Sequence, residues 1–189
     1  MTADVPVAFW RAIGDLPEDR QRALYEFEAC FAHGSVPDGL DGRLRGSLLA
    51  ITLGQHVDPV AEAAARLWMP WLGKTFDRAT NTGRNNITAG AGRFVRLLFP
   101  NYRELRAEDS HRCSAFAFQT SNGGSVLDPK TPVLRIDYRN LPGNPSWPVR
   151  RILDELVAVD DGLFLGQALF DWRGELRRTA WFSLEMGTR

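Results

Sequence analysis

Hydrophobic residues near the start of the chain recur at the spacing of an α-helix. Phe9, Ile13 and Leu16 follow one another at intervals of three and four residues, which places them on one helical face. A proline then opens a second apolar series of the same kind. We therefore predict two helices over residues 6–32, with Gly34 as a left-handed cap at the end of the second.

The next segments alternate between the patterns of strands and helices. Residues 40–53 carry apolar side chains in a spacing typical of a sheet, whereas residues 57–72 return to helical spacing. Residues 78–92 are rich in Thr, Asn and Gly and show little periodicity, so we predict a loop there.

From residue 93 onward the chain has the rhythm of short strands separated by turns. The extended segments are predicted over residues 93–99, 103–108, 112–119, 133–139, 149–159, 163–172 and 176–185. Turn-forming residues separate several of them, at positions 121–124, 160–162 and 173–174. Residues 149–157 also match a helix, and periodicity leaves that choice open. Such a series is typical of an antiparallel meander or a closed barrel.

The expected fold is mostly β with N-terminal helices, in the α+β class. A chain of 189 residues is one domain by length. We expect a helical segment over residues 1–36, followed over residues 37–189 by an antiparallel β-barrel with an internal cavity. A helix over residues 58–72 is expected to cover one end of that barrel.

The charge balance and the cysteines narrow the function classes. Lys plus Arg (23) equals Asp plus Glu (23), so there is no overall positive field to attract nucleic acid or an anionic membrane. No stretch reaches ~18 consecutive apolar residues and the start lacks a basic leader, which predicts a cytoplasmic protein. Cys30 and Cys113 are far apart and lack a zinc-site pattern, so both are predicted to be buried thiols. Of the 23 basic residues only Lys74 and Lys130 are lysines.

Several enzyme classes are disfavoured because their motifs are missing. The chain has no GxSxG elbow, no P-loop, no GxGxxG after a strand and no HExxH. Its three histidines, His33, His56 and His111, are not paired at metal-ligand spacing. No histidine follows His111, where a haem-binding barrel strand would need one. We therefore predict neither a metal nor a cofactor.

Three short segments combine glycines, aromatic residues and charges. Gly42 and Gly46 enclose a strand segment that places Arg43 and Arg45 on one face. A second segment spans residues 69–77. In the third, Leu134, Ile136 and Tyr138 alternate with three charged residues, Arg135, Asp137 and Arg139. The sequence leaves open which of the two faces points inward.

These segments, taken in order, resemble the small bacterial GXWXG-type family. The matching positions are Gly42 to Gly46 with Leu44 in place of the family's Trp, then Pro70, Trp71, Gly73, Lys74 and Phe76, the strand 135–139, and a run over residues 148–166. The resemblance spans roughly residues 40–185 and implies a calycin- or lipocalin-like barrel with an internal cavity. It implies no settled chemistry, because a fold alone does not carry an activity.

Two residues are the catalytic candidates. His111 precedes an apolar strand and is a general-base candidate by its chemistry, although a lone histidine is more often structural. Asp137 forms an ordinary surface ion pair if its face is outward, and a buried polar site if its face is inward. Asp154 and Glu155 are adjacent, so they face opposite sides of a strand and are predicted to contact solvent.

The ligand-binding candidates are aromatic residues and arginines that a barrel cavity could present. They are Arg43, Arg45, Trp68, Trp71, Phe116, Phe118, Arg135, Tyr138 and Trp181. The tryptophans are core residues by default. Tyr138 stands out because its hydroxyl needs a partner when buried, and a ligand could supply one.

The leading hypothesis is a protein that binds a small apolar metabolite of the lipid, terpenoid or polyketide type, as in secondary metabolism. The alternative is a cofactor-independent enzyme, such as a cyclase, isomerase or lyase, acting on such a molecule in the same cavity. A third reading is a structural barrel whose core is filled by side chains and whose surface meets another protein. The expected partner is the apolar ligand, with no nucleic acid or membrane, and a homodimer is left open.

Overall fold

The computed structural model describes residues 5–52 and 71–187. Its helices are α1 (Val5–Asp15), α2 (Arg20–His33), α4 (Ala89–Leu98) and the short 3-10 helix η1 (Val149–Arg151). Its strands are β1 (Gly42–Ile51), β2 (Trp71–Asp77), β3 (Thr82–Thr88), β4 (Arg106–Ala107), β5 (Arg112–Gly124), β6 (Pro132–Asp137), β7 (Ile152–Asp160), β8 (Leu163–Trp172) and β9 (Glu175–Met186). No helix in this described part is long and apolar enough to cross a membrane.

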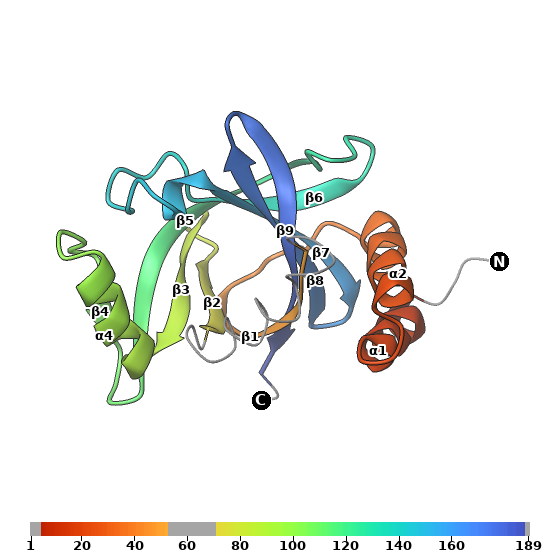
Figure 1. Ribbon diagram of the computed structural model, residues 1–189, viewed down its shortest axis with the longest axis horizontal. Helices are drawn as coiled ribbons and strands as arrows, with labels where there is room; N and C mark the ends of the chain where they lie inside the picture. Colours follow the sequence, from red (N-terminus) through yellow and green to blue (C-terminus); the bar gives the residue numbers. More distant parts are fainter. Residues whose placement is uncertain (1–4, 53–70, 188–189) are drawn as a thin grey trace.

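Eight of the described strands close into an antiparallel barrel, as the sequence predicts. The strand order around it is β3-β2-β1-β9-β8-β7-β6-β5, and pairing of β3 with β5 completes the ring. The short β4 pairs only with β5, outside that ring. Figure 1 shows the barrel with α1 and α2 on one side and α4 on the opposite side.

The two N-terminal helices are confirmed, but their last cap is different from the prediction. The side chain of Asp19 caps α2 by accepting a hydrogen bond from the backbone N–H of Arg22 at 3.0 Å. Gly34 has φ −69°, so it is extended and not a left-handed cap. A glycine is needed at this position because the backbone passes close to β7, and a Cβ at residue 34 would lie 2.6 Å from the Val157 side chain.

The segment after β2 departs most from the sequence prediction. The predicted loop over residues 78–92 is wrong, because this stretch forms β3 and the first turn of α4. The predicted strand over residues 93–99 is also wrong, because these residues continue α4. The side chain of Thr88 caps this helix, and Ala91 and Val95 pack against β5. Tertiary contacts therefore decide the structure where local periodicity is weak.

The turn predicted at residues 121–124 is wrong, because these residues continue β5 and pair with β6. The last two strands follow their predicted positions closely. Strand β8 has the predicted bounds, and the predicted strand over residues 176–185 is β9 with one more residue at each end. The ambiguous stretch after residue 149 resolves into one 3-10 turn followed by β7. The strand predicted over residues 103–108 is only the two-residue β4. The helix predicted over residues 57–72 falls outside the described residues, except that Trp71 and Leu72 begin β2.

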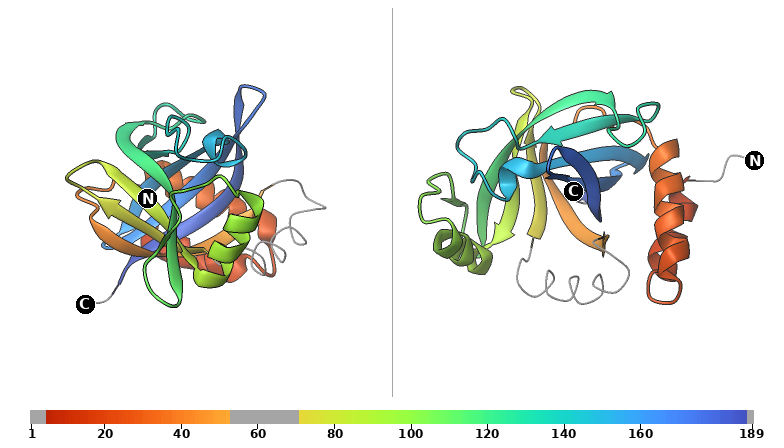
Figure 2. Two further views of the ribbon diagram at one scale, coloured as in Figure 1. Left: turned by 90° about the vertical axis from the view of Figure 1, so that its left-hand side faces the viewer. Right: turned by 45° about the horizontal axis from the view of Figure 1, so that its top comes forward.

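The barrel wall separates two hydrophobic clusters. The inner one fills the barrel and includes Phe76, Phe118 and Phe182. The outer one lies between the wall and helices α1 and α2, where the fully buried Trp181 packs against Phe31. Figure 2 shows the two helices standing against the outside of the barrel. The helices therefore cover one wall of the barrel and leave its interior to the strands.

Candidate functional site

A lysine lies buried at the centre of the barrel. Lys74 is on the inner face of β2 and is 2% exposed. Its ammonium group donates to the Oδ1 atom of Asn85 at 3.0 Å, to the hydroxyl of Tyr138 at 2.5 Å and to the Oδ2 atom of Asp154 at 2.8 Å. These three oxygens match the three protons of the ammonium, so its hydrogen-bonding capacity is filled.

The partners of the lysine also bond to one another. The amide Nδ2 of Asn85 donates to the Tyr138 hydroxyl at 3.0 Å, and that hydroxyl lies 3.1 Å from Asp154 Oδ2, to which it can donate. The indole N–H of Trp71 donates to Asn85 Oδ1 at 3.0 Å. We call Lys74, Asn85, Tyr138 and Asp154 the lysine cluster. Strands β2, β3 and β7 each contribute one of its members, and Tyr138 follows directly after β6.

Four aromatic rings surround the ammonium nitrogen. Its distances to the ring centroids are 5.3 Å for Trp71, 5.5 Å for Phe118, 5.2 Å for Tyr138 and 5.3 Å for Phe182. Rings at this distance attract a cation and exclude water.

Glycines on neighbouring strands make room for three of these rings. A Cβ at Gly46 would collide with the Trp71 ring, one at Gly83 with the Phe118 ring, and one at Gly166 with the Phe182 ring. The glycines let the rings lie flat on the inner wall, close to the lysine.

Burial and pairing act in opposite directions on the lysine. Burial lowers the pKa of Lys74 below its ordinary value of 10.5, and the neighbouring Asp154 carboxylate only partly opposes that effect. Burial also raises the pKa of Tyr138 well above 10, and the charge of Asp154 adds to this. Tyr138 is therefore a phenol, and Lys74 gives up its proton more easily than a lysine in water.

The backbone beside the cluster is strained. Phe116 has φ +51° at a β-bulge in β5, in the left-handed region that a bulky residue rarely adopts. The Tyr102 hydroxyl accepts a hydrogen bond from the Phe116 N–H at 2.5 Å, and the Phe116 carbonyl accepts one from Asn85 at 3.4 Å. Backbone strain of this kind is concentrated at functional sites.

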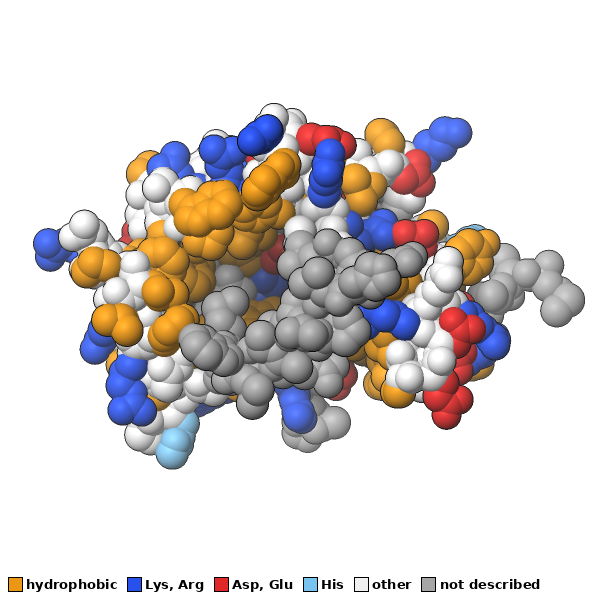
Figure 3. Space-filling view, viewed as in Figure 1, with side chains coloured by type: hydrophobic (Ala, Val, Ile, Leu, Met, Phe, Trp, Pro, Cys, Tyr) orange, Lys and Arg blue, Asp and Glu red, His pale blue; other side chains and the backbone are white. Residues whose placement is uncertain are grey.

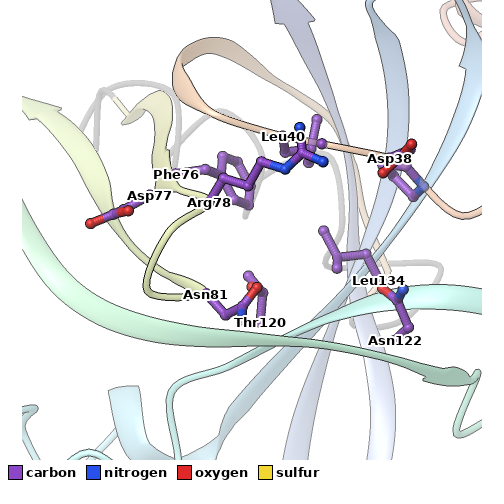
Figure 4. A pocket seen from close by; sticks show the side chains of 11 residues that line it. Asp38, Leu40, Phe76, Asp77, Arg78, Asn81, Thr120, Asn122 and Leu134 are labelled. Carbon is purple, nitrogen blue, oxygen red and sulfur yellow. The ribbon is translucent and has the colours of Figure 1, made fainter.

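A pocket of about 160 Å³ opens at the end of the barrel where β2 ends and β3 begins. Figure 4 shows Leu40, Phe76 and Leu134 facing this pocket, with Asp77, Arg78 and Asn81 at its rim. The Phe76 ring contacts the Phe118 ring at 5.3 Å, and Phe118 is one of the rings around Lys74. Two phenylalanine rings therefore separate this mouth from the lysine.

A second pocket, of about 400 Å³, lies on the β2, β3 and β5 side of the wall. Arg84, Arg106 and Glu108 are among its lining residues, and Arg84 is paired with Glu104 at 2.9 Å. Apolar side chains share this groove with the charged ones, and they include Phe76 and Phe118. Among the described residues, no three His, Cys, Asp or Glu side chains gather in a way that could hold a metal ion.

The two predicted catalytic residues lie away from the lysine cluster. Asp137 is on the outer face of β6, where its carboxylate forms a two-point ion pair with Arg139 at 2.8 and 3.0 Å. His111 is exposed at the start of β5, and its backbone N–H bonds to Asp109. Tyr138 shows that the apolar face of this strand is the inward one.

Of the predicted ligand-binding residues, Trp71, Phe118 and Tyr138 are brought together around Lys74, and Phe116 is next to them at the bulge. The others point elsewhere. Arg43 and Arg45 are exposed on the outer face of β1, Arg135 bonds to the carbonyl of Gly124, Trp181 is in the outer core, and Trp68 falls outside the described residues.

The sequence reasoning did not select Lys74 or Asn85, and it placed Asp154 at the surface. Asp154 and Glu155 do face opposite sides of β7, but both are buried, so their predicted solvent contact is wrong. Two signals pointed to the missed residues. Lys74 is one of two lysines in a chain that otherwise uses arginine, and Asp154 interrupts an apolar strand.

One solved structure supports the fold and leaves the function open. The chain is similar to the crystal structure of a protein from Thermomonospora curvata, with a TM-score of 0.52 and 17% sequence identity over 96% of this chain and 99% of that one. At this identity the likeness shows the fold alone. No family model and no curated protein matches the sequence.

Proposed function

We propose that the barrel binds a small, largely apolar molecule and holds one oxygen atom of that molecule at the lysine cluster, in place of one of the three hydrogen-bond partners of Lys74. The observation that carries this proposal is the buried pair of Lys74 and Asp154, 2.8 Å apart and enclosed by aromatic rings. A lipid, terpenoid or polyketide-type metabolite combines the apolar body and the oxygen that such a site would recognise.

A buried ion pair is poorly explained as a device for stability. Taking two charges out of water costs several kcal/mol, and well-packed apolar residues in their place are often neutral or stabilising by about 1–4 kcal/mol. The surrounding barrel is otherwise filled by leucine, isoleucine and aromatic side chains. A charged pair at this position is therefore better explained by recognition or chemistry than by packing.

The pocket at the end of the barrel is the mouth through which a ligand would enter, and it sets the first limit on the size of that ligand. Its volume of about 160 Å³ is close to that of a cavity that holds a benzene-sized group. A longer ligand would reach the lysine cluster by displacing the rings of Phe76 and Phe118. Replacing Phe76 with alanine should open that path.

The first experiment is native mass spectrometry of the purified protein, followed by extraction and identification of any bound molecule. A second measurement compares the shifts in melting temperature caused by decane, decan-1-ol and decanoic acid. We expect the two oxygen-containing probes to raise the melting temperature more than decane does. A probe at a hundredfold excess over its Kd should stabilise the folded protein by about 2.7 kcal/mol relative to the protein without ligand.

The matched variants are K74M/D154L, which removes the charged pair as a unit, and D137N, which removes a charge from the outer wall. We expect the double variant to lose the preference for the oxygen-containing probes, and D137N to keep it. A protein that is empty and unshifted by all three probes would contradict the proposal and favour a structural barrel with a filled core.

The alternative of a cofactor-independent enzyme rests on a different observation. Lys74, Tyr138 and Asp154 exchange hydrogen bonds within 2.5–3.1 Å, so a proton can pass among them at a site shielded from water. Incubation of the extracted molecule with the protein distinguishes the two functions, because an enzyme changes it and a carrier returns it intact.

We also propose that the chain is related to the GXWXG-type family, that its barrel is of the calycin-like class and that the protein is cytoplasmic. The inner cluster includes Leu44 where that family has a tryptophan. In this chain the Trp71 ring lies against Gly46, at the end of the same motif.

A further inference from the structure

The choice of lysine at the barrel centre calls for an explanation. The chain has 21 arginines and two lysines, and it uses arginine for the cation in its other described ion pairs with side-chain carboxylates, such as Arg84 with Glu104 and Arg139 with Asp137. Lys74 is the exception, and it lies at the most buried of these pairs. Arginine never loses its charge in a protein, whereas a lysine can become a neutral amine.

A neutral amine is a nucleophile, and the lysine cluster has groups that can manage its protons. Asp154 lies 2.8 Å from the nitrogen and can accept a proton, and the Tyr138 hydroxyl at 2.5 Å can donate one. We propose that Lys74 forms an imine with an aldehyde or ketone ligand bound in the barrel. This inference rests on the proposed binding function and adds the class of ligand and a covalent bond to it.

The reaction balances with the groups present. Asp154 takes one proton from the ammonium, which leaves a lone pair on the nitrogen. The nitrogen attacks the carbonyl carbon, and the carbonyl π electrons move to the oxygen, which takes up a proton through Tyr138. The carbinolamine then loses its second N–H proton and its hydroxyl group as water, and a C=N bond forms. The three ammonium protons end on Asp154 and on the released water.

The surroundings of Lys74 favour this bond. Four aromatic rings and the barrel wall keep bulk water from the nitrogen, and water is the reagent that hydrolyses an imine. Burial lowers the pKa of Lys74, which increases the share of reactive free amine at neutral pH. Asp154 on β7 and Tyr138 directly after β6 are the titratable groups that face it.

The test is reductive trapping with sodium cyanoborohydride and an aldehyde probe, either benzaldehyde or decanal. Peptide mapping by mass spectrometry then compares alkylation at Lys74 with that at Lys130, which is exposed in the loop after β5 and reports ordinary lysine reactivity. We expect alkylation at Lys74 to be faster by about tenfold or more, because a bound aldehyde is held next to the amine.

Two variants test the assignment of the label to Lys74 without peptide mapping. K130R leaves Lys74 as the one side-chain amine, and its intact-mass spectrum should keep a label beyond the one carried by the terminal α-amine. K74M/D154L should lose the barrel label while Lys130 is still alkylated. Labelling of the wild-type protein should also rise with pH, since only the free amine reacts.

The experiments distinguish a failure of the imine proposal from a failure of the proposed binding function. If decan-1-ol raises the melting temperature but Lys74 stays unmodified while Lys130 is alkylated, the barrel binds ligands and the imine is overturned. If neither decan-1-ol nor decanal changes the melting temperature and Lys74 stays unmodified, both proposals fall.

Discussion

Two neighbouring carboxylates of β7 are buried on opposite sides of the barrel wall. Asp154 is 5% exposed on the inner face and is paired with the ammonium of Lys74. Glu155 is fully buried on the outer face, where its partners are the Ser125 hydroxyl at 2.6 Å, the Val126 N–H at 2.7 Å and the Gln167 amide at 2.7 Å. One carboxylate is thus balanced by a cation, and the other by neutral donors.

The outer carboxylate has the features of a structural anchor. Ser125 and Val126 belong to the loop between β5 and β6, so Glu155 ties that loop to the wall. The chain of contacts continues through Gln167 and Arg178 to Glu28 on α2. Arg178 also covers the ring of Trp181. Here every polar group joins one element of the fold to another.

The inner carboxylate has different surroundings. Its partners can gain or lose protons, the rings around them attract a cation, and a pocket opens two rings away. Burial is common to both carboxylates and does not distinguish them. The proton-exchanging neighbours of Asp154 do distinguish it, and the proposed function is placed there for that reason.

The surface offers a further contrast. Figure 3 shows hydrophobic side chains gathered over the loop before η1, the β8–β9 hairpin and α4. The exposed members of this surface include Trp147, Trp172 and Leu97, and Phe170 contacts both tryptophan rings. The inner aromatic rings, in contrast, are arranged around a charge.

The largest expected effect comes from breaking the inner pair. The single change K74M leaves the Asp154 carboxylate buried without its cation and should cost about 3–5 kcal/mol in the free energy of unfolding. Urea titration followed by tryptophan fluorescence measures this loss. The double variant K74M/D154L should recover most of it, and a harmless K74M would show that the pair is not charged in the folded protein.

The outer anchor should be almost as important for stability and unimportant for ligands. E155A leaves the donors of Ser125, Val126 and Gln167 without their acceptor. A buried polar group left unpaired costs about 1–3 kcal/mol, so we expect the free energy of unfolding to fall by roughly 3 kcal/mol. The response to decan-1-ol, measured by the melting temperature, should be unchanged. Loss of that response at retained stability would place Glu155 in the binding function.

Two groups of the lysine cluster, Lys74 and Tyr138, should change the stability of the protein at alkaline pH in opposite directions. Because the folded-state pKa of Lys74 is below 10.5, the unfolded chain binds more protons in the alkaline range, and Lys74 makes stability rise with pH there. The pKa of Tyr138 is raised above 10, so the folded protein keeps a proton that the unfolded chain loses, and stability should fall above pH 10. Y138F should remove the part of that fall that Tyr138 causes, while Tyr102 and Cys30, whose pKa values burial also raises, should keep the rest. The variant should cost about 1 kcal/mol at neutral pH, as measured by urea titration across pH 8–11.

The smallest effect is expected at Asp137. Burial raises the pKa of this carboxyl, but hydrogen bonds from Arg139 outweigh burial and hold the pKa below 3.8. Its contribution is therefore present above that pH and is lost as the pH falls further. At pH 7, D137N should cost less than ~1 kcal/mol in urea titration and should leave trapping at Lys74 unchanged. A loss of trapping would restore Asp137 as a catalytic candidate.

Local chemistry explains which elements could be predicted. The turn residues at 160–162 and 173–174 delimit β8 within the sequence itself, and its bounds agree with the prediction. Strand β3 and helix α4 could not be read in this way. Asn85 and Asn86 are typical of loops, and they lie in a strand because Lys74 and Thr75 supply hydrogen bonds to their side chains from the neighbouring strand β2.

The sequence by itself determined the class of the fold, because alternation, turn residues and helical spacing are properties of neighbouring positions. It also determined which residues of β6 share a face, since successive side chains of a strand point to opposite sides. The tertiary structure decided which face is inside and which residues form the site. Asn85 is 11 positions from Lys74 and reaches it through the pairing of β2 with β3. Tyr138 and Asp154 are 64 and 80 positions away, and only closure of the barrel brings them within hydrogen-bonding distance.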